Sequence, residues 1–446
     1  MADVIIVGAG PAGIFAALEL VRQKPGLDIV IIEKGKDIYE RSRSANEMLI
    51  GWGGAGAYSD GKLTISSEVG GQLAGVISEE RLMGLLDTVD GMYREYAAPD
   101  QVFSVEGDDA AWISAKARLA GMIYLPTRVR HIGTENCYTV LKNMRDDLDG
   151  KITIKCKAEA KAILHDGQRV AGVVLDDGAT IDAGYVIVAP GRAGSAWMAN
   201  EAKRLGLDAW PNPVDLGVRV ELPAVIFEKL TTLAYETKFI YYSKTFDDKV
   251  RTFCMNPYGE VVQESVDDLL TVNGHSWKNK HTENTNFAIL VSANFTQPFD
   301  DPIGYGKSVA SMANMLGKGV IIQRLGDLLK GRRTTDSRLQ RCSTRPTLKT
   351  AIPGDLSYCI PYRILTDIVE MLECLDHIAP GVHSDHTLLY GIEVKFYSHR
   401  IQLDSELCTQ MSGLYVIGDG AGITRGLMQA SCSGILAAQS IISQCS

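Results

Sequence analysis

The sequence predicts an α/β protein of two domains, in which a mixed β-rich domain is inserted into a discontinuous domain built on a parallel sheet. The first observation is length, because 446 residues make two to three domains at about 150 residues each. The second is a β-α-β pattern within residues 3–33. The third is the return of an apolar strand-turn-helix pattern from about residue 385, after a central region of different character.

Composition excludes several classes of protein. Hydrophobic residues make up 46% of the chain and charged residues 22%, so it can bury a large core and is not disordered. The net charge of −9 argues against a nucleic-acid partner, because such a protein needs a basic stripe to meet the phosphates. Glycine is in excess, with 44 residues, and the motifs below explain where much of it lies.

The N-terminus and the cysteines limit the protein's location and chemistry. The first twenty residues are apolar, but they lack a basic n-region and are interrupted by three glycines and a proline. We therefore expect a cytoplasmic protein with no membrane partner. The nine cysteines form no Cys-x-x-Cys pair and no zinc-ligand cluster, so we expect reduced thiols and no metal site.

Residues 3–33 are expected to fold as strand, helix and strand. Residues 3–7 form a short apolar run without alternation, which is typical of a parallel strand covered on both faces. From residue 11 to residue 23 apolar side chains recur at helical spacing, and Pro25-Gly26 ends the helix. Residues 28–33 form a second apolar run. Together they make one β-α-β unit.

The turn between this first strand and the helix carries the motif Gly-Ala-Gly-Pro-Ala-Gly, residues 8–13. In a GxGxxG motif the first glycine makes a tight turn, the second lets the backbone approach a pyrophosphate, and the third allows close helix–strand packing. Glu33 ends the second strand twenty residues later, where an acidic side chain accepts a hydrogen bond from a ribose 2′-hydroxyl. The motif in this context predicts a Rossmann-like dinucleotide-binding domain.

A second formal GxGxxG, residues 51–56, lacks a preceding strand and a following periodic helix. With residues 58–62 it is predicted to be a flexible loop whose backbone passes close to something flat, and the alternative is a plain surface loop. Farther along, a helix is expected near 136–148, and residues 215–350 read as a mixed β-rich region. Four short strands are expected between them, near 152–156, 160–164, 170–175 and 185–189.

Two later segments favour FAD over NAD as the dinucleotide. Residues 185–191 form a buried strand that ends in a small-x-Gly turn, and residues 413–422 form a strand that delivers Asp419 at its C-terminal end. They resemble the "ATG" and "GD" signatures of flavoproteins with the glutathione-reductase-like FAD fold. That resemblance implies that Asp419 bonds the ribityl and pyrophosphate region. It also implies that the helix from Leu427 aims its positive N-terminus at the flavin.

Further motifs resemble the FAD-dependent dehydrogenase, or NAD(FAD)-utilising dehydrogenase, family. They occur in the same order along most of the chain, at Arg41, Asn46, 53–63, 131–135, 251–255, 272–276, 389–393 and 418–422. The tail 423–428 departs from the family's usual form. The resemblance implies a discontinuous FAD-binding domain, residues 1–70, 120–214 and 385–446. The remaining residues, 71–119 and 215–384, would form a substrate or cap domain.

The motifs and the resemblance together give a set of predicted FAD-binding residues. They are Gly8, Ala9, Gly10, Pro11, Ala12, Gly13, Glu33, Lys34, Arg41, Gly54, Ala55, Ala160, Gly191, Gly418, Asp419 and Gly422. Lys34 and Arg41 are expected to meet the ribose and the phosphates, and the backbone of Ala160 to touch the adenine.

Three residues are candidates for catalysis. Lys62, in the glycine-rich loop, can stabilise the reduced flavin anion or bind a carboxylate, and the alternative is a solvated lysine. Arg400 matches an arginine in the family pattern and can clamp an anion, unless it forms a structural salt bridge. His275 lies in the inserted region, where an ordinary loop histidine is the alternative.

The predicted function is an FAD-dependent oxidoreductase, a dehydrogenase or reductase, acting on a small organic substrate held by the cap domain. The alternatives are a flavin-dependent monooxygenase and a non-catalytic FAD-binding interaction protein. No second GxGxxG unit lies between about residues 140 and 300, so NAD(P)H, if used, would bind transiently. The sequence does not predict an oligomeric state.

Overall fold

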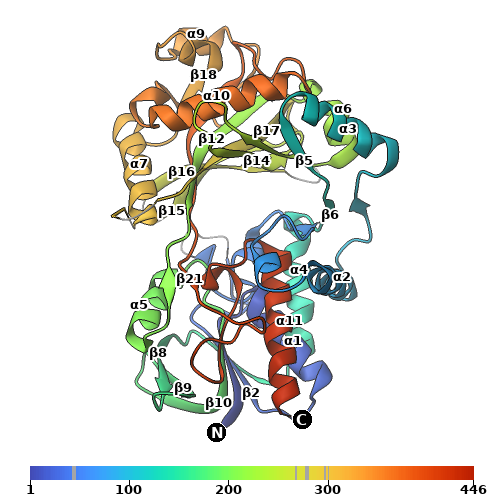
Figure 1. Cartoon of the computed structure of the whole chain (residues 1–446), viewed down its shortest axis with the longest axis vertical. Coiled ribbons are helices and arrows are strands. Elements are labelled where there is room, and N and C mark those ends of the chain that lie inside the picture. The colour runs from blue at the N-terminus through green and yellow to red at the C-terminus, as the bar shows by residue number, and fades with distance from the viewer. Residues whose placement is uncertain (43–46, 267–268, 277–280, 296–297, 300, 446) are drawn as a thin grey trace. The chain divides into compact units, whose positions relative to one another are not determined.

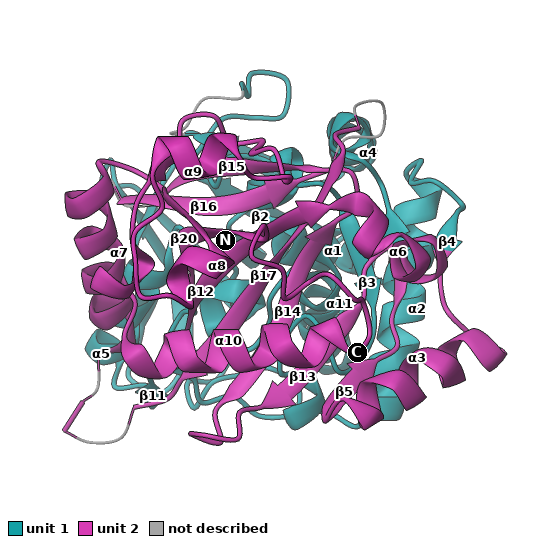
Figure 2. Ribbon diagram, turned by 90° about the horizontal axis from the view of Figure 1, so that it is seen from above, with its two compact units in different colours: residues 1–102, 130–212, 397–446 teal, residues 103–129, 213–396 magenta. Residues whose placement is uncertain are grey.

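The computed structural model describes residues 1–42, 47–266, 269–276, 281–295, 298–299 and 301–445. It divides into two compact units, coloured separately in Figure 2. Unit 1 contains residues 1–102, 130–212 and 397–446, and unit 2 contains residues 103–129 and 213–396. Each unit has its own hydrophobic core.

Unit 1 is built on a seven-stranded sheet with the order β7-β2-β1-β10-β9-β8, in which β22 also pairs with β10. The strands β7, β2, β1, β10 and β22 pair in parallel, and β9 and β8 extend the sheet in antiparallel fashion. The bounds are β1 Ala2–Val7, β2 Ile29–Glu33, β7 Thr153–Cys156, β8 Ala160–His165, β9 Val170–Leu175, β10 Thr180–Val188 and β22 Leu414–Val416. Because β1 and β2 are covered on both faces, their residues form the continuous apolar runs seen in the sequence.

Two apolar helices of unit 1 lie side by side, the first and the last of the chain (Figure 1). They are α1, Pro11–Gln23, and α11, Leu427–Gln444. Small residues let them approach closely, since a Cβ on Gly434 would lie 2.1 Å from the carbonyl oxygen of Ala12. The other elements of unit 1 are η2 Gly54–Tyr58, β3 Lys62–Ile65, η3 Leu73–Gly75, α2 Glu79–Glu95, α4 Thr134–Leu148, α5 Ser195–Leu205, β11 Ala209–Trp210, β21 Arg400–Ile401 and η6 Gly418–Ala421. The strands β4 Val102–Phe103 and β6 Arg128–His131 belong to the two stretches where the chain passes from one unit to the other.

Unit 2 is built on an eight-stranded mixed sheet with the order β19-β18-β20-β12-β17-β14-β13-β5. Its strands are β5 Met122–Leu125, β12 Val214–Pro223, β13 Lys238–Tyr242, β14 Lys249–Asn256, β17 Asn284–Ala293, β18 Ile321–Arg324, β19 Ile352–Pro353 and β20 Leu388–Lys395, beside a hairpin of β15 Glu260–Val266 and β16 Leu269–His275. Its helical segments are α3 Gly107–Leu119, η4 Ala224–Ile226, α6 Glu228–Ala234, α7 Pro302–Gly317, α8 Leu325–Leu328, α9 Asp336–Gln340, η5 Leu356–Tyr358 and α10 Tyr362–Asp376. The α10 helix packs its apolar side on β12, β14 and β17.

The boundaries of the units differ from the predicted ones in three places. Residues 71–102 lie in unit 1, because the amphipathic helix α2 packs its apolar face on α11. Residues 120–129 and 385–396 lie in unit 2, because β5 pairs with β13 and β20 pairs with β12 and β18. The sequence pattern of a strand does not state which sheet it joins, so these boundaries depended on pairing.

Membrane spans and metal clusters are both missing from the described part of the chain. In it no helix has both the length and the hydropathy needed to cross a bilayer. The same residues contain no group of three or more His, Cys, Asp or Glu side chains placed to hold a metal ion.

A buried ion pair lies inside the sheet of unit 2. The Arg219 guanidinium donates to both carboxylate oxygens of Glu393, from Nε at 2.8 Å and from Nη2 at 2.6 Å, and both side chains are fully buried. The Lys395 ammonium lies 3.0 Å from the same carboxylate. Glu393 therefore compensates two cations that are removed from water.

We expect Glu393→Ala to destabilise unit 2 by about 3–5 kcal/mol, because it leaves Arg219 buried without a counter-charge. The measurement is urea unfolding followed by circular dichroism. The matched control is Glu373→Ala, whose carboxylate is 58% exposed and which should shift stability by less than about 0.5 kcal/mol. Equal stability of the two variants would contradict the electrostatic role of Glu393.

Candidate functional site

The three glycines of the first turn differ in the space that surrounds each of them. Gly8 has a positive φ of +102°, and a Cβ there would lie 2.2 Å from the carbonyl oxygen of Ala189. A Cβ on Gly13 would lie 2.0 Å from the carbonyl oxygen of Gly8. A Cβ on Gly10, in contrast, would meet no atom within 4 Å, and its extended backbone suits any residue. Packing therefore requires Gly8 and Gly13, whereas Gly10 borders open space.

Gly10 is also the N-cap of α1, and this helix end lacks the usual acceptors. Its cap makes no side-chain hydrogen bond, no acidic residue occupies the first turn, and Pro11 stands at the first helical position. The backbone N–H groups of the first turn and the helix dipole therefore face the open space beside Gly10. Such a helix terminus binds anions, and phosphate groups most of all.

Glu33 fastens three separate turns at this site. Its side chain is buried, and Oε2 accepts a hydrogen bond from the Ala9 N–H at 2.9 Å. Oε1 accepts from the Gly35 N–H and from the Gly51 N–H, both at 2.8 Å. A carboxylate with two oxygens can accept about four hydrogen bonds, so a ribose hydroxyl can still be added. Glu33, which was predicted to bind the ribose, thus also holds three backbone segments of the protein together, and we call this its clamp role.

Arg41 folds the glycine-rich loop. Its Nη1 donates to the carbonyl oxygens of Trp52, at 2.6 Å, and Gly54, at 2.9 Å. Its guanidinium lies 4.8 Å from the centre of the Tyr58 ring. Burial is the largest influence on this side chain and lowers the pKa of Arg41. Lys34 is more exposed, with its Nζ 3.8 Å from Glu159.

The glycine-rich loop is held in place rather than flexible. The Trp52 side chain is fully buried, and its indole N–H donates to the Leu141 carbonyl on α4 at 3.0 Å. The Gly53 N–H donates to the Ala9 carbonyl at 2.7 Å, and a Cβ on Gly54 would lie 3.3 Å from the Cα of Gly10. The loop, including Ala55, thus passes directly beside the first glycine turn. The buried Trp52 thus anchors the loop to α4.

The ends of β10 and β22 bring two further glycine turns to the same edge of the sheet as the first turn. Gly191 follows β10 with a φ of +58°, and a Cβ there would meet no atom within 4 Å. A Cβ on Gly418, after β22, would lie 3.0 Å from the Cβ of Ala12 in α1. Gly422 is a packing glycine, because its Cβ would lie 2.5 Å from the His399 carbonyl oxygen. Gly10 and Gly191 are thus the two predicted site glycines that border open space.

Asp419 lies between these turns. Its Oδ1 accepts a hydrogen bond from the Thr424 hydroxyl at 2.8 Å. Burial raises the pKa of Asp419, and the nearby Arg192 and Arg425 oppose that shift. Neither arginine was among the sequence candidates, since no spacing rule joins them to Asp419. Ala160 begins β8, where it pairs with Leu175.

Lys62 is not a solvated lysine. Its side chain is 8% exposed, and its Nζ lies 3.1 Å from the carboxylate of Asp60. His131, on β6, belongs to the same cluster, and burial lowers its pKa, with Asp60 opposing and Lys62 adding to the shift. The pairing of β3 with β6 assembles this group. His131 and Asp60 both lie in the family-like motifs, but neither was given a role from the sequence alone.

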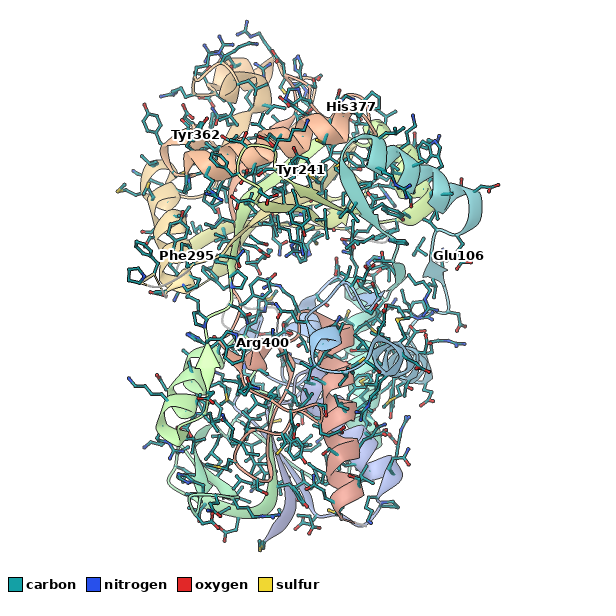
Figure 3. All side chains as sticks on the ribbon, in the orientation of Figure 1. Glu106, Tyr241, Phe295, Tyr362, His377 and Arg400 are labelled. Atoms are coloured by element: carbon teal, nitrogen blue, oxygen red, sulfur yellow. The ribbon has the colours of Figure 1, made fainter. Side chains whose placement is uncertain are left out.

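Arg400, which is labelled in Figure 3, lines a pocket of about 230 Å³ in unit 1. Its Nη1 donates to the amide oxygen of Gln72 at 2.6 Å, and its guanidinium lies 5.8 Å from the centre of the Trp210 ring. The expected alternative, a salt bridge, is not what Arg400 forms among the described residues. Ile423, on the loop after Asp419, lines the same pocket. Gln72 and Trp210 were missed because they come from separate parts of the chain.

His275 lies in unit 2, as the last residue of β16, opposite Glu260 in the hairpin. Lys62 and Arg400 both lie in unit 1. Asn46, part of the family-like loop motif, lies outside the described residues.

Two family models match the chain. The model of FAD dependent oxidoreductases matches residues 3–262, and that of the FAD-dependent protein, C-terminal domain-like, matches residues 213–396. The chain belongs to the FAD dependent oxidoreductase family. The predicted α/β class, with a Rossmann-like FAD-binding fold and a β-rich further domain, is therefore confirmed, as is the prediction of an FAD-dependent oxidoreductase. Membership of the narrower NAD(FAD)-utilising dehydrogenase family stays a prediction.

Individual relatives have low sequence identity to this chain. An uncharacterized protein of Clostridium beijerinckii is 26% identical over 486 aligned positions, which cover 98% of this chain and 80% of the relative. Among solved structures, a mutant FrdA of E. coli quinol fumarate reductase is 14% identical with a TM-score of 0.44, over 99% of this chain and 70% of its own. L-proline dehydrogenase from P. horikoshii is 11% identical with a TM-score of 0.42, over 99% of this chain and 94% of its own.

The different environments of the glycines yield a paired prediction. We expect Gly10→Val to fold and to lose FAD, because its Cβ would enter the open space before the α1 terminus without meeting a protein atom within 4 Å. Gly13→Val should instead destabilise the fold, because its Cβ would overlap the Gly8 carbonyl. The measurements are the flavin-to-protein absorbance ratio and the thermal unfolding midpoint of the purified variants. Stoichiometric FAD in Gly10→Val would contradict this placement of the pyrophosphate.

Proposed function

We propose that the protein is an FAD-dependent dehydrogenase or reductase that holds FAD along the glycine turns of unit 1. The single observation that carries the proposal is the space beside Gly10, which the protein's own packing leaves open before a helix end without acceptors. A pyrophosphate supplies both the bulk and the negative charge that this place suits. The family match supplies the identity of the dinucleotide.

The remaining contacts are assigned along FAD, from its ribose through its phosphates to its ribityl chain. We assign the ribose to the side of Glu33, and the phosphates to the first turn, residues 8–13, and the adjoining loop at Gly54 and Ala55. The ribityl chain belongs near Gly191 and Asp419. The other assigned contacts are Lys34, Arg41, Ala160, Gly418 and Gly422. When bound, FAD supplies the two-electron redox chemistry.

The chain's own residues bind the substrate and place protons. Lys62 holds a positive charge beside Asp60 in a nearly buried position, where it can stabilise a developing anion. Arg400 pairs with a neutral amide rather than a carboxylate, so its guanidinium keeps its charge available for an anionic substrate group in the Trp210 pocket. We assign substrate selection to unit 2, with His275 as its candidate proton carrier.

The substrate in this proposal is a small organic molecule, and the enzyme works in the cytoplasm. The electron donor is either that substrate or a nicotinamide nucleotide that binds transiently. These two donors predict opposite directions of electron flow, so one experiment separates them.

The test is anaerobic reduction of the purified flavoprotein, which is monitored as a loss of flavin absorbance. We expect a pool of small organic metabolites, or NADH or NADPH, to reduce the bound flavin, and the effective donor then sets the direction. Failure of every donor to reduce a flavin that dithionite reduces would contradict an enzymatic role and favour a non-catalytic FAD-binding protein. The reduced protein is then mixed rapidly with oxygen. Direct return of the oxidised spectrum supports this proposal, whereas a transient species before that return would favour a monooxygenase.

A further inference from the structure

One segment of unit 2 is strongly basic although the chain is acidic. Residues 324–349 contain eight Lys or Arg and two Asp, a local net charge of +6 in a chain whose net charge is −9. We call this segment the basic strip. It runs from the end of β18 through α8 and α9 to the turn before β19, and Figure 1 labels α9 and β18. The average charge of the chain conceals this concentration.

The basic strip is anchored to the body of unit 2. The buried carboxylate of Asp327 accepts from the Arg332 Nε at 2.8 Å and from the Thr334 hydroxyl at 2.9 Å. Farther along, the Thr347 hydroxyl donates to Glu221 at 2.5 Å, and the Asn284 amide donates to the Arg345 carbonyl at 2.7 Å. These hydrogen bonds hold the backbone that carries the exposed cations against the rest of unit 2.

Four exposed cations of the basic strip, Arg333, Arg341, Arg345 and Lys349, have no carboxylate partner within the described residues. The guanidiniums of Arg341 and Arg345 donate only to backbone carbonyls within the strip, at 3.2 and 3.0 Å. Their positive charges are therefore available to an external anion.

Exposed apolar side chains flank these cations. Leu329 is 46% exposed beside Lys330, Ile352 of β19 is 47% exposed, and Tyr358 of η5 is 72% exposed. The three belong to one region, because the Thr334 N–H donates to the Gly354 carbonyl at 2.9 Å and the Gln323 amide donates to the Arg332 carbonyl at 2.9 Å and to Asp355 at 3.3 Å. A basic cluster beside exposed aliphatic and tyrosine side chains is typical of a surface that rests on a bilayer.

We propose that the basic strip and its apolar flank, Leu329, Ile352 and Tyr358, dock unit 2 on an anionic lipid surface. Clusters of four to eight Lys or Arg bind such surfaces, and aliphatic side chains enter the interface between the headgroups. A nucleic-acid partner is less well served, because two of the three exposed flanking side chains, Leu329 and Ile352, are aliphatic and offer no ring on which a base could stack. The proposal is independent of the flavin and of the reaction, and it replaces the expectation that the protein has no membrane partner.

The test is co-sedimentation of the flavin-loaded protein with vesicles of phosphatidylglycerol and phosphatidylcholine, compared with pure phosphatidylcholine. We expect binding to the anionic vesicles alone, and at least a tenfold loss of that binding in 0.5 M salt. At low salt the variant Arg333→Glu/Arg341→Glu/Arg345→Glu should bind the anionic vesicles at least tenfold more weakly than the wild type. The matched control, Lys116→Glu/Arg118→Glu/Lys249→Glu, reverses three exposed cations elsewhere in unit 2 and should keep the binding.

The apolar flank is tested by Leu329→Asn/Ile352→Asn, which should weaken vesicle binding several-fold without changing its salt dependence. The flavin spectrum and circular dichroism of each variant report folding. The proposal is overturned if wild-type protein ignores anionic vesicles, if the two charge-reversal variants bind equally, or if a single-stranded RNA competes fully with the vesicles for the strip.

Discussion

The arrangement of the first unit depends on one carboxylate. Glu33 stands at the end of β2 and accepts hydrogen bonds from Ala9, Gly35 and Gly51, which belong to three different turns. Without Glu33 the Ala9 and Gly51 N–H groups would be buried donors without this acceptor, and the Gly35 N–H a partly buried one. A charged acceptor binds such donors more strongly than a neutral one. The first glycine turn and the glycine-rich loop are therefore placed beside one another before any ligand arrives. Preorganisation of this kind lowers the cost of binding a long, flexible dinucleotide.

The glycine excess of the chain has two physical origins at this site. Gly8, Gly13 and Gly422 are small because backbone atoms of the protein lie where a side chain would be. Gly10 and Gly191 face open space instead, so packing gives no reason for their size. For Gly191 the left-handed φ of +58° gives that reason, and for Gly10 the pyrophosphate that we propose there gives it. The distinction cannot be read from the motif, which treats its glycines alike.

The sequence predicted the local elements well and their assembly less well. The strands and helix of residues 3–33, the helix at 134–148 and the closing helix from Leu427 follow from apolar periodicity and from glycine and proline stops. The assignment of β20 and β5 to unit 2 did not, because it depends on which distant strand each one pairs with. The same limit applies to the site. Glu33 and Asp419 lie at predictable strand ends, whereas His131, Trp210 and Arg192 reach the site through tertiary contacts alone.

The clamp role of Glu33 is tested most directly by amide hydrogen exchange of the FAD-free protein. In Glu33→Gln the side-chain amide oxygen can keep at most two of the three donors, as Oε1 does in the wild type. We therefore expect at least one of the Ala9, Gly35 and Gly51 amides to exchange at least about tenfold faster, since a hydrogen bond to a charged acceptor contributes about 1.5–3 kcal/mol. The exposed Glu159→Gln serves as the control and should leave these rates unchanged. If Glu33 acts only on the ribose of bound FAD, exchange in the FAD-free protein will be the same in Glu33→Gln as in the wild type, and that result would contradict the clamp.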